Sequence, residues 1–230
     1  MTSIEALYAA HPELYSSKHD AEHRVERRLG ILDLVEHGTV GAELGVFTGL
    51  FAKAILETVR PAVLHLVDPW WLAYGDLYPD WGVYTAGGTL PTHVAHKAAV
   101  TRTDAARGDC EVHVHVSTSA DWLRNIPDAS LDWSYIDSTH YYRPTLGELR
   151  LLRDKLRPEG LVIGDDWKPE PSDPHHGVFR AVHELVREGM WDLLRADKQR
   201  QWAIRPAAEY RRGERYRQAF RARVNRLLRR

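Results

Sequence analysis

The sequence contains a single cysteine, Cys110, among 230 residues, which excludes an internal disulfide. No apolar run approaches the roughly 18 residues that a membrane-spanning helix needs. No charged segment followed by an apolar one resembles a signal peptide. These absences fit a reducing compartment, so we expect a cytoplasmic protein with no membrane span.

The chain also has almost no net charge. Its formal charge of −1 excludes a global field that would attract nucleic acid or a membrane surface. An asymmetry lies behind this value, because residues 211–230 carry nine arginines and one glutamate, a charge of +8, which leaves −9 for the remainder. With 43% hydrophobic residues the chain can bury a proper core, and we expect one globular domain with appendages.

The most informative stretch runs from Leu131 to Trp167. Apolar runs predict strands at Leu131–Ile136 and Leu161–Gly164, and leucines at helical spacing predict a helix over Leu146–Leu156. Residues 157–160 are expected to end that helix, because proline cannot continue it and glycine tolerates positive φ. A strand–helix–strand of this length is a βαβ unit, in which the two strands are parallel.

Acidic residues follow both strands of this unit. Asp137 follows the first strand, and Asp165 and Asp166 follow the second. Open parallel sheets bind ligands at the carboxyl ends of their strands, so three carboxylates would converge there and would need a cation. One such acid is often only a helix cap or a turn former. Three of them, with His140 close behind the first, favour a functional site.

A glycine turn forms the second motif. VGAELGVFTG at Val40–Gly49 predicts a strand and a glycine turn, and Leu50–Val59 predicts the helix that follows. Val63–Val67 is the next predicted strand, and Asp68 lies about twenty residues after the turn, where an acid can bind a ribose diol. The spacing is not G-x-G-x-x-G, and a purely structural turn is the alternative for the glycines alone. Together, the glycine turn and Asp68 indicate that this half of the sheet binds a nucleoside.

The remaining central segments are less specific. Residues 69–90 are rich in aromatic residues, glycine and proline, and we expect a lid or an acceptor-binding loop, with packing over the sheet edge or a dimer contact as the alternative. Glu111–Val116 alternates as a strand does. Ser119 then lies at the start of a helix, where it contacts a cofactor base or caps the helix. Trp191–Arg195 and Gln201–Ile204 predict a terminal hairpin.

Both ends of the chain differ from this central pattern. Residues 1–37 are expected to form an arm or lid with an amphipathic helix over Ala21–His37, or a solvated terminus. Residues 206–230 predict a basic amphipathic helix that could lie on an acidic partner, a membrane surface or nucleic acid. Docking on the chain itself or on a second copy is slightly favoured, and a homodimer is expected. The domain between them spans residues 38–205.

The motifs together resemble those of class I S-adenosylmethionine-dependent methyltransferases. VGAELGVFTG resembles their first motif and HLVDPW the second, while IDSTHYY and GLVIGDDW resemble the metal-dependent O-methyltransferases of catechol and macrocin type. The chain is most similar to small actinobacterial sugar O-methyltransferases, one type of which methylates O1 of a 3-O-methylmannoside at the start of methylmannose polysaccharide synthesis. The resemblance covers residues 38–205.

This resemblance implies a fold and a cofactor site. The fold is a doubly wound, Rossmann-like α/β sheet of seven strands in the order 3-2-1-4-5-7-6, with strand 7 antiparallel and helices on both faces. The cofactor is S-adenosylmethionine. Its methionyl part would be held by Glu43, Gly45 and Gly49, its ribose by Asp68, and its adenine would lie near Ser119.

The resemblance also implies a metal site and a base. Asp137, Asp165 and Asp166 would ligate Mg²⁺ or another divalent cation. The catechol type usually has asparagine where Asp166 stands, and it typically uses a lysine beside the reacting oxygen where this sequence has His140. We expect His140 to take the proton of the acceptor hydroxyl, with the His175-His176 pair in reserve.

Two other classes of function stay open at this point. A nicotinamide (NAD(P)) oxidoreductase could use the glycine turn and Asp68, but it would not need three acids after neighbouring strands. A nucleic-acid (RNA) methyltransferase or binding module would use the arginine-rich tail as a phosphate clamp. The favoured function is Mg²⁺-dependent methyl transfer to a hydroxyl of a small molecule, with a sugar as the expected acceptor.

Overall fold

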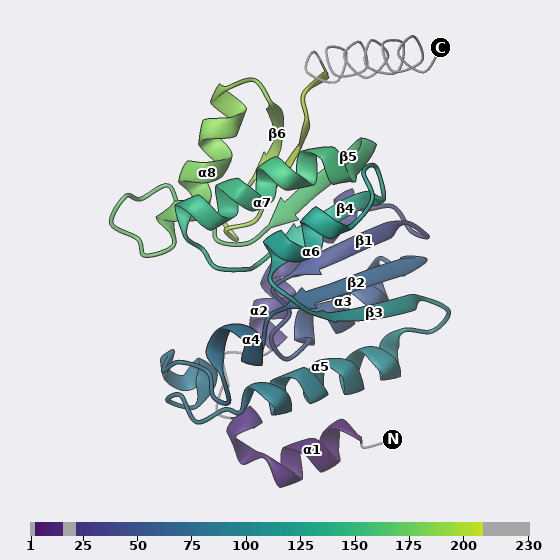
Figure 1. Ribbon diagram of the computed structural model, residues 1–230, viewed down its shortest axis with the longest axis vertical. Coiled ribbons are helices and arrows are strands. Elements are labelled where there is room, and N and C mark those ends of the chain that lie inside the picture. The colour runs from purple at the N-terminus through teal and green to yellow at the C-terminus, as the bar shows by residue number, and fades with distance from the viewer. Residues whose placement is uncertain (1–2, 16–21, 209–230) are drawn as a thin grey trace, which may run out of the picture.

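The computed structural model describes residues 3–15 and 22–208 of the chain, and it places seven strands in one sheet (Figure 1). The strands are β1 (Val40–Leu44), β2 (Val63–Asp68), β3 (Glu111–Val116), β4 (Leu131–Ile136), β5 (Leu156–Gly164), β6 (Trp191–Ala196) and β7 (Trp202–Pro206). Their order is β3-β2-β1-β4-β5-β7-β6. β1 to β5 pair in parallel, and β7 is antiparallel to both of its neighbours. The predicted fold is therefore confirmed.

Helices cover both faces of this sheet. The α-helices are α1 (Ile4–Ala10), α2 (Glu22–Leu29), α3 (Leu50–Thr58), α4 (Trp71–Tyr74), α5 (Thr92–Ala106), α6 (Ser119–Asn125), α7 (Tyr142–Lys155) and α8 (His176–Arg187). Short 3-10 helices occur at Pro12–Tyr15, Leu32–Leu34 and Gly82–Thr85. α6, α7 and α8 lie on one face, and α3 and α5 lie on the other, with α1 against α5 and α2 against α3 (Figure 1).

The alternation of side chains along the strands produces two hydrophobic clusters, one on each face of the sheet. In β2, Leu66 belongs to the cluster under α3 and α5, whereas its neighbour Val67 belongs to the cluster under α6, α7 and α8. Ile55 of α3 and Leu149 of α7 are fully buried in these two clusters. Burying each such side chain contributes on the order of 1.5–3 kcal/mol to the stability of the fold. The two clusters therefore stabilise the sheet that positions the site.

The helix predicted over residues 21–37 is shorter than expected, since α2 ends at Leu29. Gly30 follows directly, and its carbonyl accepts a hydrogen bond from Arg195 Nη1 of β6 at 2.7 Å. Ile31 is then fully buried, and the 3-10 helix Leu32–Leu34 follows. The helix thus ends before a glycine whose carbonyl is held by a tertiary hydrogen bond.

The prediction for residues 157–160 was wrong in part. The helix does end before them, at Lys155, but they lie inside β5 and do not form a turn. Leu156 already pairs with Leu131 at the start of β4, and the next pair joins Leu161 to Trp133. The register between the two pairs shifts, so the predicted turn is an irregular stretch within a longer strand.

The carboxyl ends of β1, β2, β4 and β5 meet at one edge of the sheet, on the left of Figure 1, and the loops that follow them lie there. Among the described residues, no helix combines the length and apolar character that a membrane crossing requires. The basic helix predicted over 206–230 lies outside the described residues from position 209 onward.

Candidate active site

Three aspartates from neighbouring strands converge at this edge of the sheet. Asp137 directly follows β4, Asp165 and Asp166 directly follow β5, and one oxygen of each lies within 4.8 Å of the others. We call these three residues the carboxylate cluster. It lies beside the junction of β1 and β4, where the strand order reverses, which is the position at which open parallel sheets bind ligands.

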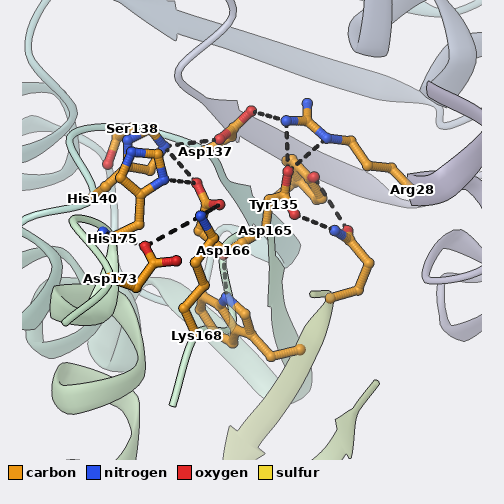
Figure 2. Close-up of polar contacts among 12 residues, drawn as sticks. Arg28, Tyr135, Asp137, Ser138, His140, Asp165, Asp166, Lys168, Asp173 and His175 are labelled. Atoms are coloured by element: carbon orange, nitrogen blue, oxygen red, sulfur yellow. Dashed lines mark hydrogen bonds and ion pairs between the residues drawn. The ribbon is translucent and has the colours of Figure 1, made fainter. Parts of the chain in front are cut away.

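Two arginines of α2 reach into the carboxylate cluster, and Figure 2 shows one of them, Arg28. Arg28 places Nη2 2.8 Å from Asp137 Oδ2 and 2.6 Å from Asp165 Oδ2. Arg27 Nη2 lies 2.8 Å from the same oxygen of Asp165. The α2 helix therefore covers one side of the cluster.

Two histidines cover its other side, against Asp166. His140 Nε2 lies 3.1 Å from Asp137 Oδ1 and 3.0 Å from Asp166 Oδ2, and His175 Nδ1 lies 3.1 Å from that same oxygen of Asp166. The two imidazole rings stack with centroids 4.3 Å apart and planes 18° apart. Figure 2 shows both rings on the side of Asp166 away from Arg28. His140 is thus oriented toward the cluster by two carboxylates and a stacked ring.

Burial and neighbouring charges shift the pKa values of these groups. Burial pushes the pKa of Asp137 upward, but the Arg28 guanidinium and the hydrogen bond to His140 outweigh it and hold this pKa below its ordinary range. For Asp165 burial prevails over Arg28, and the pKa is raised. For His140 burial lowers the pKa, but the hydrogen bond and charge of Asp137 prevail and raise it. Asp137 is therefore firmly ionised, and His140 holds a proton more readily than an exposed imidazole.

The glycine turn after β1 packs directly against the carboxylate cluster. Gly45 has a φ of 91°, and a Cβ at this position would lie 2.2 Å from the carbonyl oxygen of Asp137. Gly49 has a φ of 76°, but a Cβ there would instead lie 2.6 Å from Ala99 Cα of α5. Only glycine at position 45 lets the turn approach the cluster, whereas Gly49 is required by helix packing.

Two buried acids predicted to bind the cofactor lie beside this turn. Glu43 is 1% exposed, and its Oε2 has no hydrogen-bond partner among the described residues. Burial raises the pKa of Glu43 well above its ordinary value. Asp68 Oδ2 accepts the N–H groups of Val46 and Phe47, and Oδ1 accepts that of Trp70, all at 2.9 Å. A carboxylate oxygen accepts two hydrogen bonds, so Oδ1 keeps capacity for a ligand while Oδ2 holds the turn.

Ser119 lies beside a buried glutamate in α7, Glu148. Thr118 rather than Ser119 caps α6, because its hydroxyl accepts the N–H of Asp121 at 3.2 Å. The Ser119 hydroxyl is hydrogen-bonded to Glu148, and Ser138 Oγ donates to Glu148 Oε2 at 2.8 Å. Burial raises the pKa of Glu148 to about 7. Glu148 thus joins the start of α6 to the loop after β4.

Strained backbone conformations also occur at this edge. One non-glycine residue with positive φ follows each of β1, β2, β4 and β5 closely, namely Phe47 (53°), Trp70 (38°), His140 (59°) and Asp166 (63°). Such conformations cost on the order of 1–3 kcal/mol each and are typical of functional sites. Four further non-glycine residues with positive φ lie elsewhere in the described part of the chain, so these conformations accompany the site and do not by themselves locate it.

Aromatic residues form a wall next to the glycine turn. Residues 69–90, predicted as an irregular lid or loop, contain α4 and a 3-10 helix. Phe47 of the glycine turn stacks on Tyr84 with ring centroids 4.5 Å apart. Trp71 and Trp81 in this segment are 40% and 44% exposed, so they present aromatic surface to solvent. The segment is packed onto the turn and still leaves faces that a ligand could contact.

Several residues at the site were not predicted from the sequence: Arg27, Arg28, Glu148, Lys168 and Gln201. Alternating charges in the α2 sequence EHRVERRL indicate a solvated face, so no local signal points to Arg28. Lys168 Nζ lies 3.6 Å from Asp166 Oδ1, although the sequence shows it only as part of a loop. Of the histidine pair at 175–176, only His175 reaches the cluster, since His176 Nδ1 is 3.0 Å from the carbonyl oxygen of Lys168.

A family model described as "Methyltransferase domain" matches residues 40–167. This range contains the glycine turn, Asp68 and the whole carboxylate cluster. The chain matches no curated protein.

Solved structures share the fold over nearly the whole chain. A Methanococcus maripaludis protein, provisionally described as an S-adenosyl-L-methionine-dependent methyltransferase, has a TM-score of 0.57 at 10% identity, covering 90% of this chain and 94% of that one. A Clostridium thermocellum protein, provisionally described as an rRNA methylase, has a TM-score of 0.55 at 10% identity, covering 82% of this chain and 98% of that one. Likeness at such low identity shows the fold alone.

Proposed function

The chain belongs to the family of methyltransferase domains, and on that premise we propose that it transfers a methyl group from S-adenosylmethionine to a hydroxyl of a small molecule, with a divalent cation at the carboxylate cluster. The observation that carries this proposal is the convergence of the carboxylate cluster and His140 Nε2 beside the glycine turn. The family assignment favours a methyl donor over the nicotinamide cofactor that the sequence left open.

The residues beside the glycine turn fit the methyl donor. Glu43 Oε2 is a buried acceptor without a partner among the described residues, and such an atom costs free energy until a donor group reaches it. Asp68 Oδ1 has capacity for a ribose hydroxyl, and Ser119 is proposed to lie near the adenine. S-adenosylmethionine supplies an activated methyl group, so the task of the protein is to bind and orient the two reactants.

The carboxylate cluster fits a divalent cation. Its three carboxylates offer oxygen atoms within 4.8 Å of one another, and oxygen is the ligand that Mg²⁺ prefers. A cation bound there would supply positive charge that lowers the pKa of the acceptor hydroxyl. Asp166, where the catechol type has asparagine, would add one negative charge to this site.

His140 is the proposed base. Its Nε2 contacts both Asp137 and Asp166, whereas His175 contacts Asp166 alone, so His140 is the histidine better placed for a hydroxyl held at the cluster. The two carboxylates and the stacked ring of His175 restrict its rotation. Lys168 is not assigned this task, because its ammonium group lies 3.2 Å from Asp173 and is held in an ion pair there.

A sugar is the proposed acceptor. Trp71 and Trp81 offer exposed aromatic faces in the segment that packs on the glycine turn, and such faces suit the apolar side of a sugar ring. The resemblance to sugar O-methyltransferases supports the same class, and O1 of a 3-O-methylmannoside is the first hydroxyl to test. The homodimer stays a prediction, which sedimentation velocity would check.

The first test is calorimetric titration of S-adenosylhomocysteine with and without Mg²⁺, followed by methyl transfer to a panel of sugars. We expect micromolar binding, and turnover that a chelator abolishes while S-adenosylhomocysteine still binds. Asp137→Asn should lose turnover, whereas Asp192→Asn, an exposed aspartate on β6, should not. Absence of S-adenosylhomocysteine binding would contradict the methyltransferase proposal. Full turnover in the presence of chelator would contradict only the part concerning the cation.

A further inference from the structure

The guanidinium group of Arg28 lies where the proposed cation would bind. Its Nη2 is 2.8 Å from Asp137 Oδ2 and 2.6 Å from Asp165 Oδ2, and its Nε donates to that same Asp165 oxygen at 2.8 Å. Figure 2 shows the guanidinium reaching both aspartates from the side opposite His140. Only 9% of the Arg28 side chain is exposed. Arg28 is therefore an internal cation that bridges two of the three carboxylates.

The oxygens of Asp137 and Asp165 are all engaged by groups of the protein itself. Asp137 contacts Arg28 through Oδ2 and His140 through Oδ1. Asp165 Oδ2 contacts Arg28, and its Oδ1 accepts a hydrogen bond from Gln201 Nε2 at 2.5 Å. No oxygen of these two aspartates is left without a partner in the described part of the chain.

Positive charges of the chain itself already lie against the carboxylate cluster. Arg27 and Arg28 contact Asp165, and Arg28 also contacts Asp137. A divalent cation added to this arrangement would lie against the Arg28 guanidinium, and like charges at such distances repel strongly in a buried site. The cation and Arg28 therefore compete for the same oxygens.

We propose that Arg28 determines the cation occupancy of the site: it holds Asp137 and Asp165 in the absence of a divalent cation, and cation binding displaces it. This inference rests on the cation site of the proposed function. It adds a residue, outside the cluster, that sets the affinity for the cation.

Displacement of Arg28 would also loosen α2. Among the described side chains of this helix, residues 24–29, Arg28 alone is buried. Its neighbour Arg27 bonds to Asp165 and, through Nη1, to the carbonyl oxygen of Gln199 at 2.9 Å. These ion pairs attach α2 to the carboxyl edge, in addition to the packing of partly buried Val25 and Leu29 on the core. A displacement of Arg28 would therefore break one of the contacts that hold the helix in place.

The first test is calorimetric titration of Mg²⁺ into the full chain, its Arg28→Gln variant and a charge-matched control, Arg124→Gln. Arg124 is an exposed residue of α6 that pairs with Asp121. We expect Arg28→Gln to bind Mg²⁺ at least tenfold more tightly than the wild type, and Arg124→Gln to match the wild type. Equal or weaker binding in Arg28→Gln overturns the proposal. So does the absence of Mg²⁺ binding in both proteins.

Two further measurements keep the outcomes distinct. Hydrogen exchange in the peptide covering residues 22–29 should rise severalfold when Mg²⁺ saturates the wild-type protein, and unchanged exchange in the saturated protein overturns the displacement of Arg28. S-adenosylhomocysteine binding is measured on the same samples. If S-adenosylhomocysteine binds and Mg²⁺ does not, the proposed cation site and the inference about Arg28 are both contradicted. The proposed methyl donor is then still supported. If Arg28→Gln does not fold, Arg28→Lys replaces it. Tighter Mg²⁺ binding is expected for this variant too, because lysine cannot contact Asp165 through two nitrogens as arginine does.

Discussion

Ser138 Oγ donates a hydrogen bond of 2.8 Å to Oε2 of Glu148, which ties the residue after Asp137 to a carboxyl group buried in α7. Burial raises the pKa of Glu148 from its ordinary value of 4.5 to about 7, so the folded protein binds this proton more tightly than the unfolded chain does. The resulting stabilisation is complete below the unfolded pKa and is lost as the pH rises through about 7.

We therefore predict that the free energy of unfolding falls between about pH 5 and about pH 8.5, by up to about 3 kcal/mol from this group. Glu148→Gln cannot ionise and keeps one oxygen to accept a hydrogen bond, so it should flatten this part of the profile. Urea denaturation across the pH range measures it. Glu57→Gln, at an exposed ion pair with Lys53, serves as the control. Parallel profiles for wild type and Glu148→Gln would contradict the prediction.

Gly45→Ala should be far more damaging than Gly38→Ala. Both glycines have positive φ, but a Cβ at Gly45 would lie 2.2 Å from the Asp137 carbonyl oxygen, while at Gly38 it meets nothing within 4 Å. We expect Gly38→Ala to cost about 1 kcal/mol, from backbone strain alone. Gly45→Ala should cost several times as much and abolish S-adenosylhomocysteine binding. Urea denaturation and calorimetry measure the two effects, and equal losses would show that the close approach is unimportant.

His140→Ala should lower kcat about 10²-fold or more and leave S-adenosylhomocysteine affinity nearly unchanged, because the ring faces the carboxylate cluster rather than the glycine turn. His176→Ala is the matched control, since its Nδ1 contacts the Lys168 carbonyl oxygen instead of the cluster. Steady-state kinetics with the best acceptor, and calorimetry, provide the two readouts. If His140→Ala keeps its kcat, another group is the base.

A histidine cluster on β2 and β3 should make the fold sensitive to acid. His65 Nδ1 lies 3.1 Å from His115 Nε2, and its ring stacks on His113 with centroids 5.1 Å apart. Burial, reinforced by these two neighbours, lowers the pKa of His65 from 6.5 to about 4. The neutral ring is therefore favoured in the fold, and its stabilisation is lost as the pH falls from 6.5 toward 4.

His65→Gln should reduce this loss of stability in acid, since glutamine does not titrate. The midpoint of acid unfolding, followed by circular dichroism, should move to lower pH in this variant. His37→Gln, at an exposed histidine outside the cluster, should leave the midpoint unchanged. A midpoint that stays in place in His65→Gln would assign the acid sensitivity to other groups.

Most elements of the fold follow from local patterns in the sequence. Alternation located β3 and an apolar run located β4 at their observed bounds, and leucine spacing located the body of α7, because side chains that share one face repeat with the period of the element. The two errors arose where a distant residue intervenes. Arg195 bonds to the carbonyl of Gly30 just past the end of α2, and Leu131 pairs with Leu156 at the start of β5.

The gathering of Asp137, Asp165 and Asp166 was predictable, because acids that follow neighbouring parallel strands must meet at one edge of the sheet. Their use as metal ligands, like the assignment of His140 as base, stays a prediction. The partners of this cluster were not predictable. Arg28 precedes Asp165 by 137 positions. A contact between residues so far apart in the sequence produces no periodic pattern in either segment that would predict it. The order of residues along the chain thus set which acids share the edge, and three-dimensional packing set which cations of the chain lie against them.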